Sequence, residues 1–275
     1  MNLLNYKFDK YTTTGNDGII EKIFDTIQIQ NGFFVEFGAW DGIKGSNCRK
    51  LFEEGWSGIF IEAEKDRYLN LSENYKQHDN IICINSVVDR NNNLFDNLVK
   101  NHVNNKIDFC SIDIDGLDLE IFETFKNHMP TVVCIEGGQM LEPNFPRLSE
   151  SVAKNNIQQS LEVMVESFKN RGYKVLCSYQ DTFFIKEQYA HLFQTPNNLM
   201  ELYLDGLYTH HRRIPWIQFI LRQSGINNRI INYILQKTNY NKYGYNQRKL
   251  WAKEEKEITL DIISSLKNKL NTQDK

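Results

Sequence analysis

Five short, almost uninterrupted hydrophobic runs alternate with helix-like segments in the first half of the chain, and this alternation strongly constrains the fold. The runs are GFFVEFG (32–38), SGIFIEAE (57–64), NIICINSVV (80–88), IDFCSIDIDG (107–116) and TVVCIEGG (131–138). Strands that are hydrophobic along most of their length and separated by helices are typical of a parallel sheet covered by helices on both faces. The sequence therefore predicts an α/β fold with an open, mostly parallel sheet.

The segments around these runs carry helix and turn signals. Residues 15–27 place isoleucine and phenylalanine at helical spacing, and residues 46–55 read as a helix with Ser46 as a plausible N-cap and Gly55 just past its end. One long helix is expected over residues 149–171. Two more strands, YKVLCSY and TFFIKE, follow with so short a break between them that they must be antiparallel.

The last third of the chain differs in composition from the rest. Its segments WIQFILRQSGINNRIINYIL and KEITLDIISSLKNKL look helical, and a polar, turn-rich stretch separates them. We predict one domain over residues 1–189 and a helical C-terminal appendage over residues 190–275. The appendage is expected to cap an acceptor pocket or to form a homodimer contact.

Charge and hydropathy exclude several partners. The net charge is −3 and the pI is about 6.1, so no global positive charge favours nucleic acid or an anionic membrane surface. No hydrophobic run approaches the roughly 20 residues that span a bilayer, and the N-terminus lacks the pattern of a signal peptide. We expect a cytoplasmic protein. The five cysteines form no C-x-x-C pair, which argues against a zinc site or a disulfide framework.

In a sheet of this kind, ligands bind at the carboxyl ends of the strands. The first strand ends in VEFGAWDG, which brings Glu36, Gly38 and Asp41 to a turn. Trp40 and Asp41 add bulk and negative charge where a diphosphate would lie, so a cationic or zwitterionic ligand suits the turn better. The alternative is a core strand that happens to end in a glycine turn.

The second and third strands end in further polar residues. An acid at the end of the second strand commonly accepts hydrogen bonds from ribose hydroxyls, and Glu62 holds that position, with Glu64 as the neighbouring alternative. Asn85 and Ser86 end the third strand and could meet an adenine edge. The other interpretation of these acids is a solvated carboxylate at a helix start.

Three acids end the fourth and fifth strands. Asp113 and Asp115 alternate in sequence, so on a strand their side chains would share a face, and Glu136 ends the neighbouring strand. Adjacent carboxylates repel unless a cation, a retained proton or water separates them. Asp113, Asp115 and Glu136 therefore could bind Mg²⁺ or Mn²⁺. The alternative is a set of polar strand ends that bind nearby helix N-termini.

Several of these stretches together resemble the FkbM-type S-adenosylmethionine-dependent methyltransferases. The resemblance covers roughly residues 14–187 and rests on GNDGIIEKIF, on FFVEFGAWDGIKGSNCRKLFEEGWSGIFIEAE and on DFCSIDIDGLDLEIFE with VVCIEGG. It implies a Rossmann-like class I methyltransferase sheet of seven strands, the last of them antiparallel. The part of the chain beyond residue 190 has no counterpart in the resemblance.

The resemblance also implies roles for individual residues. Gly38, Asp41, Ser46 and Asn47 would line the methionine side of S-adenosylmethionine, Glu62 would bind its ribose, and Asp113 would lie near its methionine end. Related sugar methyltransferases bind a divalent metal with acids of the fourth and fifth strands, a pattern that falls on Asp113, Asp115 and Glu136. The sequence departs from that pattern where two glycines follow Glu136, since a second acid or amide is often found there.

Methyl transfer to a sugar hydroxyl requires a base or a metal, because the pKa of the hydroxyl is far above 7. Asp115 is the first candidate for the base. His210 and His211 in YTHHRR are the second, and this basic segment could bind an anionic acceptor, although a solvated turn or a subunit contact is the simpler interpretation. Trp40 and Trp216 could stack on a ring, but packing is the simpler interpretation of each.

Four candidate functions can be compared with these patterns, and the patterns argue against two of them. The first is O-methylation of a saccharide or glycan precursor, and the second is methylation of a nitrogen, carboxylate or phosphate oxygen. A nicotinamide-dependent oxidoreductase requires a Gly-rich diphosphate loop, which the sequence lacks. A non-catalytic cofactor-binding protein would tolerate damaged strand ends, whereas here the polar residues at the strand ends are intact.

Overall fold

The computed structural model describes residues 1–91, 94–103, 106–139, 141, 143–153, 157–194 and 198–209. The chain divides into two compact units, residues 1–209 and 210–275. All described residues belong to the first unit, so the predicted boundary at residues 189 and 190 falls inside it. The predicted cap or dimer role of residues 190–275 stays a prediction.

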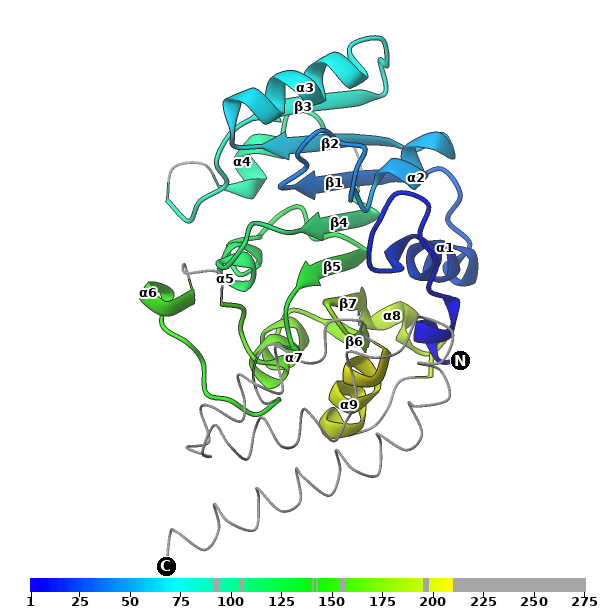
Figure 1. Cartoon of the computed structure of the whole chain (residues 1–275), viewed down its shortest axis with the longest axis vertical. Coiled ribbons are helices and arrows are strands. Elements are labelled where there is room, and N and C mark those ends of the chain that lie inside the picture. The colour runs from blue at the N-terminus through cyan, green and yellow to red at the C-terminus, as the bar shows by residue number, and fades with distance from the viewer. Residues whose placement is uncertain are drawn as a thin grey trace, which may run out of the picture. The chain divides into compact units, whose positions relative to one another are not determined.

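The first unit is built on one sheet of seven strands in the order β3-β2-β1-β4-β5-β7-β6 (Figure 1). Neighbours from β3 to β5 pair in parallel, and β7 pairs antiparallel with both β5 and β6. The predicted α/β fold, with seven mostly parallel strands and an antiparallel last strand, is confirmed. The strands are β1 (Phe33–Phe37), β2 (Ser57–Glu62), β3 (Ile81–Asn85), β4 (Phe109–Ile112), β5 (Val132–Glu136), β6 (Tyr173–Ser178) and β7 (Asp181–Lys186).

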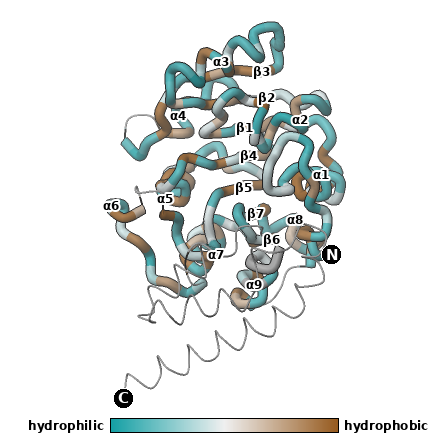
Figure 2. Tube along the Cα trace, in the orientation of Figure 1, coloured by the Kyte–Doolittle hydropathy of each residue, from teal (hydrophilic) through white to brown (hydrophobic). Residues whose placement is uncertain are grey.

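Alternate residues of each central strand enter two separate hydrophobic cores, as the period of two in a strand requires. One core holds Phe34, Phe60 and Phe109 together with side chains of α1 (Asn16–Ile27), α2 (Arg49–Glu53) and α3 (Lys65–Tyr75). The other holds their strand neighbours with α4 (Phe95–Val99), α5 (Asp118–Phe122) and α7 (Leu161–Lys169). Figure 2 shows α3 as largely hydrophilic, with hydrophobic residues only at intervals.

The edge of the sheet at β6 is covered by short helices. The helices α8 (Glu187–Ala190) and α9 (Leu199–Thr209) and the 3₁₀ helix η1 (Leu3–Tyr6) all contact β6. Leu202 and Tyr203 of α9 are buried. Residues 199–209 therefore pack with the sheet. Among the described helices, none is long and apolar enough to cross a membrane.

The prediction of one long helix over residues 149–171 is wrong. The structure has two helices there, α6 (Glu150–Ala153) and α7, and an extended Ser160 precedes α7. Ser160 forms a parallel bridge with Gly138, while the side-chain amides of Gln158 and Gln159 donate to Glu136 and Glu120. These long-range contacts explain why the helical pattern is interrupted: they bind the segment to the end of β5 and to α5.

Candidate active site at the carboxyl edge of the sheet

The strand order reverses its direction between β1 and β4. From β1, the strands β2 and β3 extend to one side of the sheet, whereas β4 and β5 extend to the other side. Such a switch point is where open α/β sheets bind ligands. Gly38 follows β1 here with φ 67°, and a Cβ atom on it would lie 1.9 Å from the carbonyl oxygen of Asp113. Only glycine lets the turn pass so close to the end of β4.

Glu62 links this turn to the end of β2. Its buried carboxylate accepts hydrogen bonds from the backbone N–H of Trp40 and from that of Glu64, both at 2.8 Å. A carboxylate has about four acceptor positions, so it can accept two more hydrogen bonds, as from ribose hydroxyls. The structure thus places Glu62 beside the turn, where the sequence predicts a ribose ligand.

Asp41 and Ser86 lie close to the same strand ends. Asp41 accepts hydrogen bonds from the backbone N–H groups of Ile43 and Lys44 and so shapes the turn after β1. Ser86 donates its N–H to the carbonyl of Glu62 and its hydroxyl to the carbonyl of Val87. Their predicted contacts with a cofactor stay predictions.

Glu36, Ser46 and Asn47 are buried rather than exposed at the edge. The carboxylate of Glu36 accepts the Ser46 hydroxyl at 2.6 Å and the Asn47 N–H at 2.8 Å, which fixes the start of α2 against β1. Burial raises the pKa of Glu36 to about 7, although these two hydrogen bonds act to lower it. Their predicted roles in binding the cofactor stay predictions.

A buried polar chain extends from Asn47 to the last strand. The Asn47 amide donates to Ser111 at 2.9 Å, and the Asn16 amide donates to both Asn47 at 2.8 Å and Asp181 at 2.7 Å. Burial raises the pKa of Asp181 to about 6, against the lowering effect of Asn16. This chain joins the start of α1, the start of α2 and β7 beneath the carboxyl edge.

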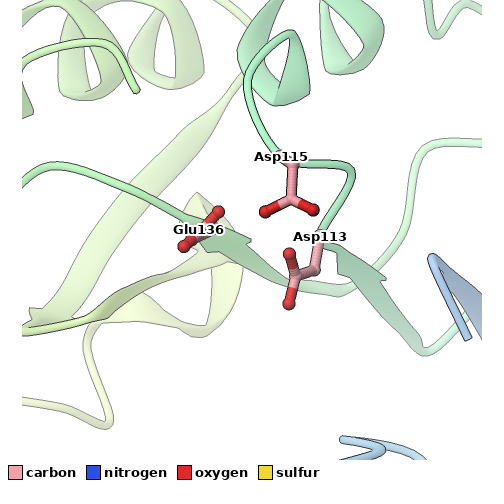
Figure 3. A group of neighbouring side chains, drawn as sticks. All are labelled: Asp113, Asp115 and Glu136. Atoms are coloured by element: carbon pink, nitrogen blue, oxygen red, sulfur yellow. The ribbon is translucent and has the colours of Figure 1, made fainter. Parts of the chain in front are cut away.

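Asp113, Asp115 and Glu136 do come together, as predicted: ligand oxygens of the three lie within 4.8 Å of one another. Figure 3 shows them gathered where β4 and β5 end, with Asp115 on the loop that leaves β4. The reason given from the sequence is wrong, however, because β4 ends at Ile112 and the two aspartates do not alternate along a strand. The loop brings Asp115 into place, with its backbone in the left-handed region at φ 61°.

Two residues that the sequence analysis missed position this group. The buried carboxylate of Asp118 accepts the backbone N–H groups of Ile114 and Gly116, each at 2.9 Å, and so holds the loop on either side of Asp115. The Gln158 amide donates to Glu136 at 2.7 Å. An acid two residues after the glycine of IDIDGLD was the available signal for Asp118, whereas no local signal marks Gln158.

Burial and neighbouring charges raise the pKa of Asp113 and of Glu136 at this edge. Surrounding protein atoms and then the charges of Glu136 and Asp181 raise the pKa of Asp113 well above its usual range, although its side chain keeps contact with solvent. Burial and the charge of Asp118 raise the pKa of Glu136 to about 7. A cation between the carboxylates would remove this repulsion, and three oxygen donors suit Mg²⁺ or Mn²⁺.

The remaining predicted site residues, His210 and His211, lie outside the described residues, as does Trp216. Asn16 and Asp181, like Asp118 and Gln158, were not among the predicted site residues. The hydrogen bond between Asn16 and Asp181 joins positions 165 residues apart in the chain. Nothing in the local sequence of either residue indicates that partner.

Comparison with known proteins gives distant structural matches only. No family model matches the chain, and no curated protein matches it. TrmK of M. capricolum, solved with S-adenosylhomocysteine, is 15% identical, with 84% of this chain and 96% of that chain covered and a TM-score of 0.40. An S-adenosylmethionine-dependent methyltransferase from Aquifex aeolicus is 12% identical, with 60% and 86% covered and a TM-score of 0.39. At such values the function must be inferred from the residues of the site.

Proposed function

We propose that this protein is an S-adenosylmethionine-dependent methyltransferase that methylates a hydroxyl oxygen of a saccharide or glycan precursor. The observation that carries the proposal is the link between the Gly38 turn and the buried Glu62, at a switch point that also holds Asp113. The resemblance of the sequence to FkbM-type methyltransferases supports the same assignment. The proposed cofactor contacts are those predicted for Glu36, Gly38, Asp41, Ser46, Asn47, Glu62, Ser86 and Asp113.

The charge of the strand ends supports this cofactor over a dinucleotide. S-adenosylmethionine carries a sulfonium and an ammonium group, and the acids Asp113, Asp115 and Glu136 would attract both. A pyrophosphate would be repelled by the same carboxylates, and Trp40 occupies part of the turn that a diphosphate loop leaves bare. A nicotinamide-dependent oxidoreductase is therefore disfavoured.

Methyl transfer is an in-line displacement at the methyl carbon. The acceptor oxygen forms a bond to that carbon as its bond to the sulfonium sulfur breaks, which leaves S-adenosylhomocysteine. The enzyme contributes mainly alignment, and the hydroxyl proton needs an acceptor. Asp115, exposed on the loop after β4, is the base that we propose for this proton. Asp113, Asp115 and Glu136 could also hold a divalent metal, which would stabilise the developing alkoxide.

The same acids bear on the choice of acceptor. A carboxylate or phosphate acceptor is anionic and would be repelled by three neighbouring carboxylates, unless a cation lay between them. A neutral hydroxyl meets no such barrier, and it also needs the base that these acids supply. The site therefore favours an alcohol over an anionic acceptor.

Titration calorimetry with S-adenosylhomocysteine tests the proposal. Wild type should bind it at micromolar concentrations, and Glu62→Ala should weaken binding by about tenfold or more, because charged hydrogen bonds to the ribose are lost. Glu73→Ala removes an exposed acid of α3 that pairs with Lys76, so it is the control and should bind like wild type. Absence of binding to wild type would overturn the proposed function. Repeating the titration with Mn²⁺ tests the metal, and Asp113→Asn should then lose any effect of the metal.

A protein that binds S-adenosylmethionine but transfers no methyl group would support the non-catalytic alternative over a methyltransferase. With bound S-adenosylmethionine and a set of neutral saccharide acceptors, methyl transfer should be lost in Asp115→Asn while S-adenosylhomocysteine binding is kept. A nitrogen, carboxylate or phosphate acceptor that is methylated equally by wild type and Asp115→Asn would replace the hydroxyl assignment.

A further inference from the structure

Trp40 has an unusual backbone conformation and an exposed side chain. Its φ is 50°, in the left-handed region that bulky residues rarely adopt, and half of the residue's surface is exposed. Packing, the simpler interpretation of this tryptophan from the sequence, therefore accounts for only about half of its surface. Strained residues of this kind persist where the surrounding structure holds them, and they cluster at ligand sites.

The contacts of Trp40 place it at the proposed ribose ligand. Its backbone N–H donates to the carboxylate of Glu62, and this hydrogen bond holds the left-handed turn. The guanidinium of Arg67 lies 5.0 Å from the centre of the indole ring, and Arg67 is fixed in turn by an ion pair with Glu64 at 2.7 Å. One side of the ring is thus supported by a cation, which is consistent with half of its surface remaining exposed.

A second exposed hydrophobic residue lies just beyond the end of β3, next to a residue that is bound to Glu62. Ser86 donates its N–H to the Glu62 carbonyl, and the following residue, Val87, has 57% of its surface exposed. Trp40 itself and Ser86, the residue before Val87, thus both donate a backbone N–H to Glu62. Planar heteroaromatic rings are stabilised by aromatic and aliphatic surfaces of this kind.

We propose that the indole of Trp40 covers the adenosine half of the bound cofactor, with Arg67 and Glu64 supporting the opposite face of the ring. The inference rests on the proposed function, since it assigns one part of the same cofactor. It adds a binding residue whose side chain is presented by the strained turn after β1. Glu62 holds the ribose and the turn together, so the ring and the ribose ligand act as one unit.

The test is the affinity for S-adenosylhomocysteine of Trp40→Gly and Trp40→Phe. Glycine accepts the left-handed conformation without strain, so Trp40→Gly should be at least as stable to heat as wild type and should still bind about tenfold more weakly. Trp40→Phe keeps an aromatic face and should recover part of the affinity. The affinity for adenosine should fall in Trp40→Gly by the same factor as the affinity for S-adenosylhomocysteine.

Tyr6 supplies a matched control. It is also an exposed aromatic, 41% accessible, with the Lys22 ammonium 5.1 Å from its ring centre, but it belongs to η1 rather than to a strand end. Tyr6→Ala should bind like wild type. Intrinsic fluorescence gives an independent signal in a background of Trp216→Phe and Trp251→Phe. The change on ligand binding should vanish there when Trp40→Gly is added, because the remaining Trp56 is only 2% exposed in the core.

The outcomes separate the two proposals. If wild type binds S-adenosylhomocysteine and Trp40→Gly binds it equally well, the assignment of Trp40 is overturned and the proposed function stands. If Trp40→Gly weakens S-adenosylhomocysteine but leaves adenosine binding unchanged, the ring covers another part of the cofactor and the assignment is again overturned. If wild type does not bind, both proposals fail.

Discussion

Gly38 shows how one residue decides the geometry of the candidate site. The turn after β1 lies against the backbone of Asp113, and a side chain there would collide with a carbonyl oxygen. The sequence indicated a turn at this glycine. It did not indicate the partner, because Asp113 is distant in the chain and is brought close by the pairing of β1 with β4.

Replacing Gly38 with alanine should destabilise the protein more than the same change at Gly45. Both glycines have positive φ, but a Cβ on Gly45 meets nothing within 4 Å. Gly45→Ala should therefore lower the free energy of unfolding by only about 1 kcal/mol, the cost of strain. Gly38→Ala adds a collision and should lose roughly 1–3 kcal/mol more. Urea unfolding measures both, and equal losses would contradict the close approach.

At the scale of elements, a buried carboxylate joins β1 to α2. Glu36 accepts hydrogen bonds from Ser46 and Asn47, and Ser46 in turn accepts the N–H of Arg49, the first residue of α2. The helix therefore starts later than the sequence indicated, while its end before Gly55 agrees with the prediction. Helix starts depend on which side chain reaches the free N–H groups, and here the acid comes from another element.

The raised pKa of Glu36 makes the stability of this link between β1 and α2 depend on pH. Between its unfolded value near 4.5 and its folded value of about 7, the folded protein holds the proton that the unfolded chain releases. The free energy of unfolding should therefore fall as the pH rises through this window, by about 3 kcal/mol from this group alone. Above and below the window the contribution is constant.

Glu36→Gln tests this dependence because it cannot ionise. The variant should be less stable than wild type at pH 4.5, since a side-chain amide replaces one acceptor of the Glu36 carboxyl group. Its deficit should shrink as the pH approaches 7. Chemical denaturation at several pH values measures the difference, and a deficit that stays constant from pH 4.5 to 7 would show that Glu36 does not titrate in this range.

At the scale of the molecule, the described hydrophobic cores lie entirely within residues 1–209, and the edge of the sheet at β6 needs residues beyond 190. Phe193, Leu202 and Tyr203 are buried there, with 8% of the surface exposed at most. The sequence placed these residues in an appendage because the alternation of strands and helices stops before them. The burial of Phe193 in the core and the contact of α9 with β6 are tertiary features that no periodicity shows.

Two truncated chains test whether the first unit ends at residue 189, as the sequence predicts, or at residue 209. A chain of residues 1–209 should unfold cooperatively in urea and bind S-adenosylhomocysteine like the full chain. A chain of residues 1–189 loses three buried hydrophobic side chains and should be less stable by on the order of 5 kcal/mol. If the shorter chain is as stable as the longer one, the boundary predicted from the sequence is correct and the packing of α9 contributes little.

The sequence by itself determined the class of fold, the antiparallel last strand and the positions of most polar strand ends. These features follow from local patterns: a hydrophobic run, a two-residue turn or a glycine after a strand can be recognised without knowing what lies across the molecule. Asp113 and Glu136 come together as predicted because β4 and β5 are parallel and end at one edge of the sheet, whereas the loop after β4 brings Asp115 to them.

Only the tertiary structure decided how those residues are held. The break before α7, the support of Asp115 by Asp118, the bridge from Asn16 to Asp181 and the exposed ring of Trp40 all depend on partners that are set by long-range contacts. A buried donor or acceptor takes whichever partner the packing brings near, because leaving it unpaired costs about 1–3 kcal/mol. That choice is made by the packed chain as a whole, so no stretch of sequence read alone contains it.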